Sequence, residues 1–485
     1  MSASAVAAVS PVTGGAVAAP TTRRRSPVKR LIHTRPGWPV VALLGGYPIW
    51  WALGFGVLVY PLLAVPMFVH LLHRRPVKLP PGFGLWVLFL AWQLLAIPAL
   101  ALNPPGTVTE TVTGRLLAVL IRLGSYLAVT VMLLYIGNLS EKELPRQRLV
   151  KLLAWMFIVT VAGGLLGVLS PTFNFTSPLE LVLPHGIRAN TYVQNLVHPA
   201  SSQVQDVLGY SAPRPKAPFE YTNAWGNNVS LFAIWFVTLV VTGGLAKRRA
   251  LKWLTLIGVL SIAALPIIYS LNRGMWIGVG LSAIYVTLRL AARRNYGPLG
   301  AMVLATLILG LVVMVTPLKD MISSRLQHGH SNQVRSSLSV ETIGLTNDSP
   351  ILGYGSTRTV AGSADSIAVG RSSSCAKCGN FNLGSNGQLW QAMIAGGYAS
   401  AGLYMGLFAY LAWRYRRDHS AIGIAGSTVM LLALFYSLVY NAFPTPIAFY
   451  FLALALLWRN EMDQATGERR TWNLGPRAKP GIGAP

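Results

Sequence analysis

Long apolar stretches recur along the whole chain, and clusters of Lys and Arg occupy every second gap between them. A helix needs about 20 mainly apolar residues to cross a membrane, and the chain contains about twelve such stretches. The basic clusters lie at residues 23–30, 74–78, 142–151, 247–252, 289–294, 414–417 and from 459 onward. Cytoplasmic loops of membrane proteins carry such an excess of Lys and Arg. The alternation therefore predicts a multi-pass protein of the cell membrane with both termini cytoplasmic.

The composition agrees with this topology and argues against a soluble protein. Hydrophobic residues make up 53% of the 485 residues and charged residues 11%, whereas soluble domains carry about 25% charged residues. The net charge of +26 is explained by the cytoplasmic clusters, which anionic lipids attract. We therefore expect membrane lipids as partners. We expect no nucleic acid, because no recognised nucleic-acid-binding module accompanies the charge.

The predicted fold is an all-α polytopic membrane protein with about twelve transmembrane helices. The spans are expected at residues 38–54, 57–72, 84–102, 116–137, 150–169, 228–246, 252–269, 275–291, 299–316, 389–411, 421–440 and 446–459. The first two are close enough to form one broken helix instead. The membrane domain then covers residues 37–461, and the polar tails at 1–36 and 462–485 are predicted to be disordered. We expect no cleavable signal peptide, because the N-terminus lacks a short apolar core followed by a cleavage site.

Two of the outward loops are long, at about residues 170–227 and 317–388. Loops of this length usually carry function, so an extracytoplasmic active site is expected there. The second loop is rich in Ser, Gly and Asn, which favours short helices and turns over a separate core. It also contains Cys375 and Cys378. Because a structural zinc site needs four ligands, a local disulfide is the favoured state of this pair, with a redox role as the alternative.

Arginine residues on the outward side are the first candidates for a functional site, because the topology rule disfavours them there. Arg273 lies in a turn between two spans, and Arg122 lies within the fourth span. Arg325, Arg335 and Arg358 lie in the second long loop. Arginine binds phosphate in a bidentate geometry that lysine cannot copy, so a lipid diphosphate would suit this set. The alternatives are solvated or headgroup-bound arginines and, for Arg122, snorkelling to the membrane surface.

Outward carboxylates and histidines are the candidates for acid–base chemistry. Glu220 opens a polar and aromatic stretch that enters a span, Asp348 precedes the sequence Ser-Pro-Ile-Leu-Gly-Tyr-Gly, and His330 ends an H-x-H pair. For each carboxylate the alternative is helix capping or a salt bridge to Arg. The H-x-H pair has no third ligand at suitable spacing, so no metal site is expected. Two further histidines lie in the first long loop, His185 and His198.

Together these segments resemble the O-antigen ligase and O-antigen polymerase superfamily. The turn from Ser270 to Trp276 is similar to an Arg-containing turn of that family, and Asn332 to Arg335 is similar to its Asn-x-x-Arg segment. Pro350 to Gly355 resembles its Pro-x-x-Gly-x-Gly element. The re-entry at Ser385 to Trp390 and the Asn-rich opening at Tyr221 to Asn228 are also similar. The resemblance extends over residues 215 to 440, and it rests on the order of these segments and their common outward side.

The resemblance implies a C-type glycosyltransferase fold with a large, partly helical extracytoplasmic loop. It implies an inverting transfer of glycan from a polyprenyl-diphosphate donor to a hydroxyl of a glycan or lipid acceptor. Because the outward arginines could replace a metal ion at the diphosphate, we expect a metal-independent transfer without a cofactor. The expected site residues are distributed by role. The diphosphate would be bound by Arg273 and Arg335, with support from Arg122, Arg325 and Arg358. The acceptor would be bound by Asn386, Gln388 and Asn223. The first candidate for the base is Glu220, followed by Asp348 and His330.

The chain departs from the family at one position. Ligases of the family place a His, thought to act as base, where this chain has Ser385. Because serine at its normal pKa is a poor base, the departure favours a polymerase over a ligase. A transporter or flippase of lipid-linked glycans is the alternative function, although such proteins usually show repeat symmetry, which this sequence lacks. A membrane scaffold or receptor is a third possibility.

Overall fold

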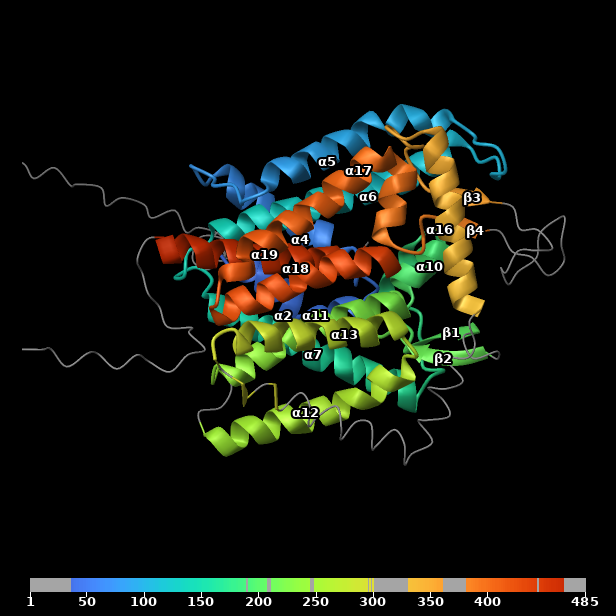
Figure 1. The fold of residues 1–485 in the computed structure, drawn as a ribbon. Helices are drawn as coiled ribbons and strands as arrows, with labels where there is room; N and C mark the ends of the chain where they lie inside the picture. Colours follow the sequence, from blue (N-terminus) through green and yellow to red (C-terminus); the bar gives the residue numbers. More distant parts are fainter. Residues whose placement is uncertain are drawn as a thin grey trace, which may run out of the picture.

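The computed structural model describes residues 36–188, 191–206, 211–244, 248–294, 296–297, 299–300, 330–360, 381–442 and 445–465. Most of these residues are helical, and most of the long helices run along one common direction (Figure 1). The helices of the first half are α2 Trp38–Gly45, α3 Tyr47–Ala52, α4 Val59–Leu72, α5 Phe83–Leu95, η1 Ile97–Ala101, α6 Val112–Asn138, α7 Arg146–Leu169, α8 Pro178–Val182, α9 His185–Arg188 and α10 Thr191–Val197.

The second half continues the bundle and adds two small sheets. Its helices are α11 Thr222–Val241, α12 Arg249–Tyr269, α13 Arg273–Ala291, α16 His330–Asp348, α17 Gln388–Arg414, η2 Tyr415–Arg417, α18 Ala421–Val439 and α19 Pro446–Ala465. Strands β1 Ser202–Asp206 and β2 Ser211–Pro215 form one antiparallel pair, and β3 Arg358–Val360 and β4 Phe381–Leu383 form another. Ser202 pairs with Pro215, and Arg358 pairs with Leu383.

Among the described residues, eight helices are long and apolar enough to cross a membrane. They are Phe83–Ala101, Val112–Asn138, Arg146–Leu169, Thr222–Val241, Ala250–Tyr269, Arg273–Ala291, Gln388–Arg417 and Ala421–Val439. Each coincides with a predicted span, so the prediction of an all-α multi-pass protein is confirmed at this level. The figure of twelve spans stays a prediction, because residues 299–316 lie almost entirely outside the described part.

The remaining predicted spans differ in detail from the observed helices. The first, at 38–54, consists of the short helices α2 and α3, which meet at Gly46. The second is α4, which has only 14 residues. The last is α19, which extends to Ala465, past the predicted end of the membrane domain at 461. α11 begins at Thr222 and not near residue 228, so the Asn-rich segment is helical.

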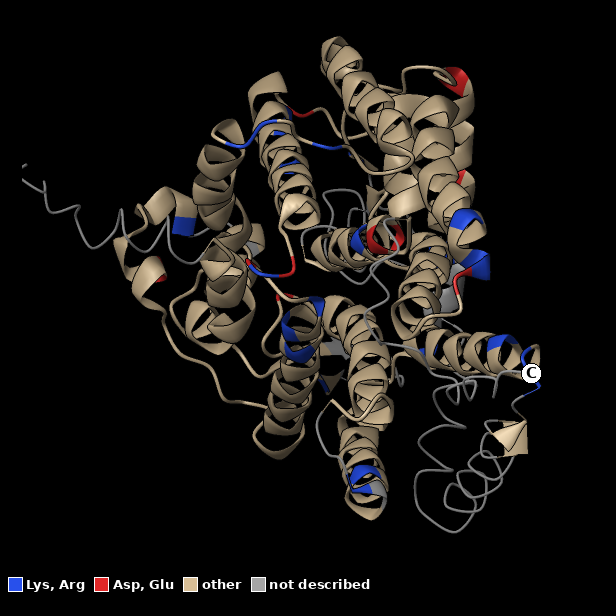
Figure 2. Cartoon of the chain, turned by 90° about the vertical axis from the view of Figure 1, so that its left-hand side faces the viewer, with Lys and Arg blue, Asp and Glu red and all other residues tan. Residues whose placement is uncertain are grey.

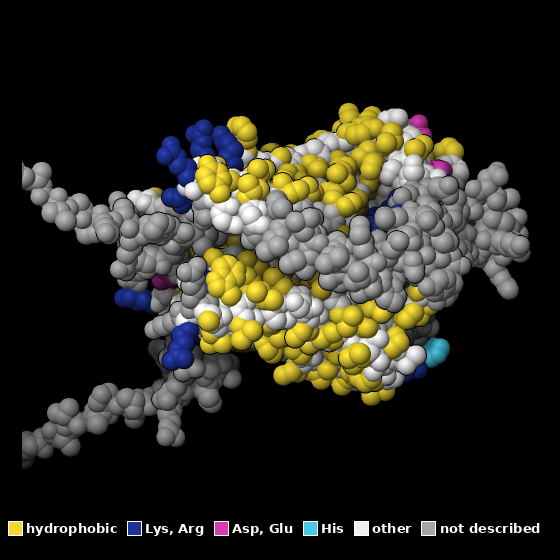
Figure 3. Space-filling model, turned by 60° about the horizontal axis from the view of Figure 1, so that its bottom comes forward, with side chains coloured by type: hydrophobic (Ala, Val, Ile, Leu, Met, Phe, Trp, Pro, Cys, Tyr) yellow, Lys and Arg dark blue, Asp and Glu magenta, His cyan; other side chains and the backbone are white. Residues whose placement is uncertain are grey.

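The two ends of the bundle differ in charge. The connections at one end carry Arg74, Arg75, Lys78, Lys142, Arg148, Lys151, Arg293, Arg294, Arg416 and Arg417. We call this the basic end; Figure 2 views the molecule from this side, and Figure 3 shows its dark blue side chains beyond a yellow apolar belt. The opposite end carries α16, which lies across the other helices, and both sheets (Figure 1). We call it the α16 end.

The core is built around α19, which is buried on all sides from Pro446 to Asn460. A helix that is apolar all round belongs in such an interior position. Aromatic pairs fill the space around it: the rings of Phe232 and Phe449 lie 4.5 Å apart, and those of Trp86 and Phe451 lie 4.6 Å apart. The central helix thereby supports the two loops that flank it at the α16 end.

α17 is a broken helix, and a turn from another part of the chain fills its break. Gly396 and Gly397 have non-helical backbone angles, and Gly397 has a φ of 68°. The N–H groups of Tyr354 and Gly355 donate to the carbonyl oxygens of Ile394 and Ala395, each at 2.9 Å. A Cβ on Gly353 would lie 2.6 Å from the backbone nitrogen of Gly397, so only glycine allows this approach. The backbone groups freed by the break are therefore paired inside the protein, as membrane depth requires.

The two long loops have more structure than the turns and short helices expected of them. The first contains α8, α9, α10 and the β1–β2 hairpin. In the second, the described residues include the 19-residue helix α16. One face of α16 is buried through Leu338, Thr342 and Thr346, which are spaced four residues apart. Cys375, Cys378 and Arg325 lie outside the described residues.

Candidate functional site

The loop between α18 and α19 lies at the centre of the α16 end. We call residues Tyr440–Thr445 the α18–α19 loop; the structure describes Tyr440 to Ala442 and Thr445. Tyr440 contacts the residue that caps α13, and Thr445 contacts Glu220, two residues before α11. These two contacts make the loop a bridge between two groups of polar side chains.

The first group begins at the turn before α13. Asn272 caps this helix by accepting a hydrogen bond from the backbone N–H of Met275 at 3.4 Å, and it also accepts one from the hydroxyl of Tyr440. Its side chain packs against α11 at Gly226, where a Cβ would collide with its amide nitrogen. Asn272 is therefore fixed from two sides. Arg273 follows it as the half-buried first residue of α13.

Arg335 of α16 joins this group from across the end of the bundle. Its Nη1 donates to the carbonyl oxygen of Val439 at 2.8 Å, and its guanidinium lies 5.9 Å from the centre of the Tyr440 ring. The positive charge of Arg335 acts on Arg273. The structure thus brings together the two arginines that the sequence singled out as the principal anion-binding pair. The two positive charges repel each other, and a bound anion would relieve that repulsion.

The second group surrounds Glu220, which is only 4% exposed. The hydroxyl of Thr445 donates to its carboxylate at 3.1 Å and accepts a hydrogen bond from the side-chain amide of Asn228, also at 3.1 Å. Burial raises the pKa of Glu220 to about 7, although hydrogen bonds from Thr445 and the charge of Lys216 act in the opposite direction. A carboxylate with a pKa near neutrality is suited to act as a general base. This is the property that the sequence assigned to Glu220.

Arg122 is the predicted anion-binding residue that lies within a membrane span. It is buried in α6, and its Nη2 donates to the hydroxyl of Ser356 at 3.2 Å. Both Arg122 and Glu220 act electrostatically on Tyr192 of α10. Arg122 therefore faces the protein interior, as expected for a charged residue within a membrane span.

Two predicted acceptor-binding residues lie at the start of α17. Gln388 is fully buried: its Nε2 donates to the hydroxyl of Tyr126 at 3.1 Å, and its Oε1 accepts from the backbone N–H of Ala442 at 3.1 Å. These bonds anchor the α18–α19 loop. Asn386 donates to the hydroxyl of Ser339 at 2.9 Å, whereas its buried Oδ1 has no hydrogen-bond partner among the described residues. Asn386 thus keeps an acceptor atom for a bound hydroxyl, and Gln388 does not.

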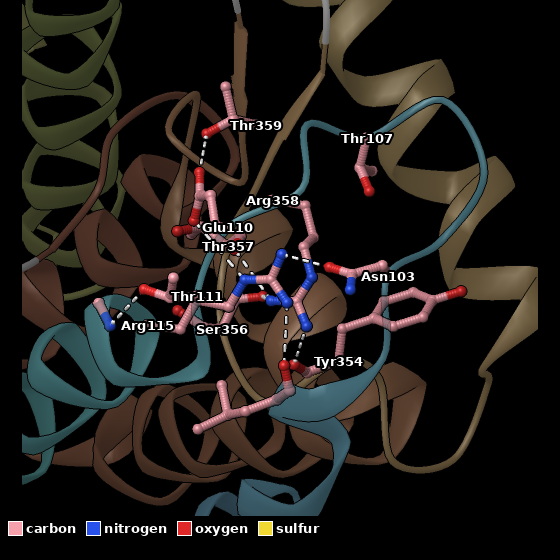
Figure 4. Close-up of polar contacts among 12 residues, drawn as sticks. Asn103, Thr107, Glu110, Thr111, Arg115, Tyr354, Ser356, Thr357, Arg358 and Thr359 are labelled. Atoms are coloured by element: carbon pink, nitrogen blue, oxygen red, sulfur yellow. Dashed lines mark hydrogen bonds and ion pairs between the residues drawn. The ribbon is translucent and has the colours of Figure 1, made fainter.

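Arg358 is engaged by the backbone around it. Its Nη1 donates to the carbonyl oxygens of residues 356 and 357, and its Nη2 to those of residues 99, 102 and 354, at 2.8 to 3.3 Å. Figure 4 shows its guanidinium beside that of Arg115, which binds Leu100, Leu102 and Asn103. Glu110 lies 3.6 Å from Arg115 and accepts a hydrogen bond from Thr359. These contacts tie the segment after η1 to the turn before β3.

The other predicted residues lie in different places. Asp348 is the exposed last residue of α16, roughly 20 Å along that helix from Arg335, at 1.5 Å per residue. The structure therefore does not bring Asp348 to the arginine pair. His330 is the first residue of α16. Asn223 is half-buried in the first turn of α11, one turn before Gly226 and so on the face toward Asn272. Among the described residues, no three His, Cys, Asp or Glu side chains cluster as metal ligands do.

Sequence reasoning assigned no role to several residues that build this site. They are Lys216, Asn228, Asn272, Ser339, Tyr440 and Thr445. A signal for the last two was present, because the sequence Tyr-Asn-Ala-Phe-Pro-Thr-Pro places polar residues and prolines between two apolar spans. Comparison of the chain with protein-family models, with curated proteins and with solved structures finds no match to any of them.

Proposed function

We propose that this chain is a membrane glycosyltransferase that moves a glycan from a polyprenyl diphosphate to an acceptor hydroxyl at the α16 end. The observation that carries the proposal is the α18–α19 loop, because it links an arginine pair to a buried carboxyl with a pKa of about 7. From Tyr440 to Thr445 the chain spans at most roughly 17 Å. An anion site and a base on one short loop support a transfer of this kind.

Arg273 and Arg335 are assigned to the leaving group. When the bond from the anomeric carbon to the diphosphate breaks, negative charge develops on the diphosphate oxygen. Donors fixed in advance around that oxygen stabilise the transition state. Arginine is suited to this task because its planar fork binds two phosphate oxygens at once. With two cations in place the reaction is expected to proceed without a metal.

Glu220 is assigned the role of base. It would accept the proton of the acceptor hydroxyl while the hydroxyl oxygen bonds to the anomeric carbon, which inverts the configuration there. Ser385 does not compete for this role, since it is exposed and its hydroxyl donates to the carbonyl oxygen of Asn382 at 2.6 Å. Asn386 and Asn223 are assigned to orienting the acceptor. A glycan acceptor would make the enzyme a polymerase, and a lipid or wall acceptor would make it a ligase.

The direct test uses the purified protein in detergent with a polyprenyl-diphosphate-linked glycan, with and without EDTA. A ladder of products that survives chelation would support a metal-independent polymerase. A single shifted band that needs an added acceptor would support a ligase. Absence of product with wild-type protein and every donor and acceptor tried would count against the proposal.

Substitutions at Arg273 sharpen this test. Arg273→Ala removes a donor aimed at transition-state charge, so we expect the rate to fall by on the order of 10²–10³. Arg273→Lys keeps the charge and loses the fork, so a large loss is expected there too. The matched control is Arg188→Ala, which removes an arginine of the first long loop that is not assigned to the site. Wild-type rates in Arg273→Ala would remove Arg273 from the mechanism.

A transporter of lipid-linked glycans is the second candidate, because the break in α17 resembles the discontinuous helices of transporters. In transporters the ends of broken helices bind substrate or ions. In this chain the backbone groups of the break are paired with residues 350–355. This pairing favours the transferase. Movement of a labelled glycolipid between leaflets of vesicles, without any change in its glycan, would favour the transporter.

A further inference from the structure

A buried base must return its proton to water after every turnover. Glu220 is 4% exposed, so bulk water does not reach its carboxyl directly. The titratable groups that act on it are lysine and tyrosine side chains, whose ordinary pKa values are about 10; they are Lys216, Tyr47, Tyr60, Tyr192 and Tyr221. A group that exchanges protons near neutral pH would have to lie between Glu220 and the surface.

A small pocket provides the connection. Glu220 and His198 both line it, together with Trp51, Gly56, Val197 and Pro218. The side chain of His198 is 27% exposed, so it contacts both the pocket and the outside. Imidazole accepts and releases protons near neutral pH. His198 therefore has the location and the chemistry of a relay between the buried carboxyl and water.

The surroundings of His198 hold its ring in one orientation. Its Nδ1 lies 2.8 Å from Oε2 of Glu180, and its Nε2 lies 3.2 Å from Oδ1 of Asn174. Gln194 donates to the other oxygen of Glu180 at 3.1 Å. Burial opposes ionisation of Glu180, but these hydrogen bonds outweigh it and lower the pKa of Glu180. Both ring nitrogens thus face oxygen atoms of neighbouring side chains.

We propose that His198, oriented by Glu180, passes protons between Glu220 and external water through this pocket. The inference rests on the proposed role of Glu220 as base. In each cycle Glu220 gains the proton of the acceptor hydroxyl, and the departing diphosphate keeps the electron pair of the broken bond. Water in the pocket then takes the proton from Glu220 and gives it to His198 as His198 releases one outside. Glu220 is left as a carboxylate for the next cycle.

The test measures proton access and needs no glycosyltransfer. The protonated carboxyl of Glu220 is followed by infrared spectroscopy at pH 6, and its band is assigned with Glu220→Gln. After transfer to D₂O, the rate at which this band shifts reports proton exchange. Two variants interrupt the route, His198→Gln and Gly56→Ala. A Cβ on Gly56 would lie 3.8 Å from Trp51 and 3.9 Å from Pro218, so the added methyl group fits among the wall residues without a collision.

We expect exchange to slow by tenfold or more in both variants. Gly84→Ala is the matched control, since it adds a methyl group where no atom lies within 4 Å, and its exchange should equal that of the wild type. Wild-type exchange in both route variants would overturn the proposal. Slowing in Gly56→Ala alone would also overturn it, because the pocket would then conduct without the histidine.

Kinetics separate this inference from the proposed function. If the wild type is an active transferase, His198→Gln should lower kcat with KM unchanged, and added imidazole should restore part of the rate. Unchanged kcat across the pH range would contradict the relay while leaving the transferase intact. If exchange slows in both variants but no glycan is transferred, the proton route stands and the proposed function fails.

Discussion

Arg335 and Arg358 are both arginines, but they differ in how many backbone carbonyl oxygens they bind. Arg358 is 1% exposed and donates to five carbonyl oxygens, whereas Arg335 is half-buried and donates to one. A lysine has a single ammonium group and cannot replace the five bonds. We infer that Arg358 holds the fold together and that Arg335 is available to a ligand.

Substitution by lysine should separate these two roles. Arg358→Lys is expected to lower the stability of the protein by about 3 kcal/mol, since hydrogen bonds from a charged group are lost in the interior. Arg335→Lys is expected to keep near wild-type stability and to lose on the order of 10²-fold in transfer rate. Thermal unfolding in detergent and the glycan-transfer assay measure the two effects. Equal destabilisation by both substitutions would contradict the assignment of a structural role to Arg358 and a ligand-binding role to Arg335.

The buried carboxyl of Glu220 predicts a dependence of stability on pH. Its pKa is raised from 4.5 to about 7 in the folded protein, so the folded protein holds this proton more tightly than the unfolded chain. As the pH rises from about 4.5 to 7, the unfolded chain ionises first, and stability falls by about 3 kcal/mol before it levels off.

The variant Glu220→Gln removes this ionisable group and should remove the fall. The difference in Tm between Glu220→Gln and the wild type, measured at one scan rate, is therefore expected to grow in favour of the variant from pH 5 to pH 8. A difference that stays constant over this range would show that Glu220 does not titrate in that window.

Some residues of the candidate site could be selected from the sequence, whereas the contacts of others could not. Arg273 and Glu220 were selected as charged residues where outward loops meet the spans, Arg335 as an arginine of the second long loop, and Asn386 from the resemblance to the superfamily. The contacts of Gln388 and Arg358 could not be identified in that way, since Tyr126 lies 262 residues from Gln388 and Ala99 lies 259 residues from Arg358. Partners this distant leave no local pattern of spacing or charge.

At the scale of elements, α17 shows why a broken helix needs a specific partner. Gly397 has a φ of 68°, and a Cβ there would collide with the carbonyl oxygen of Pro350 and lie 2.6 Å from that of Ile351. The turn from Pro350 to Gly355 completes the hydrogen bonding of the break. The sequence motifs on both sides, Pro-x-x-Gly-x-Gly and Gly-Gly, are therefore two halves of one backbone junction.

Substituting alanine for two glycines of α17 tests this junction. Gly397→Ala is expected to lower stability by about 2 kcal/mol or more, because strain at the left-handed backbone is added to the collision. Gly402→Ala is the matched control in the same helix, where no atom lies within 4 Å of the added Cβ. It should be neutral or stabilising by up to about 1 kcal/mol. Thermal unfolding of both variants in detergent is the measurement. Similar unfolding temperatures would show that the backbone junction does not require glycine at position 397.

The helices were predictable from the sequence where a run of residues was both long enough to cross a membrane and apolar throughout. Eight predicted spans coincide with long apolar helices because a run of about 20 apolar residues has no stable alternative in a membrane. The run at 38–54 was misjudged, since hydropathy does not register the interruption at Gly46 that divides it into α2 and α3. The length of α16 was not predicted, because its buried face consists of Leu338 and threonines, too polar for a hydropathy search.

At the scale of the whole molecule, the basic end and the α16 end predict an orientation in the membrane. The excess of Lys and Arg should keep the basic end in the cytoplasm. The test begins with a chain in which Cys375 and Cys378 are changed to Ser. Val340→Cys then places a thiol on the exposed side of α16, and Lys142→Cys places one at the basic end.

A membrane-impermeant thiol reagent applied to intact cells should label Val340→Cys and leave Lys142→Cys unlabelled. Permeabilised cells provide the control, since both positions should then react. Labelling of Lys142→Cys in intact cells would reverse the orientation and place the candidate site in the cytoplasm.

The filled break in α17 has a consequence for biosynthesis. Residues 350–355 precede α17 in the chain, so the ribosome makes the turn before it makes the helix that receives it. When Ile394 and Ala395 are synthesised, the N–H groups that pair with their carbonyl oxygens already exist. A broken helix that entered lipid alone would leave those oxygens unsatisfied, at a cost of several kcal/mol each. The order of residues along the chain thus also sets an order of assembly, in which the turn at residues 350–355 is made before the helix whose break it fills.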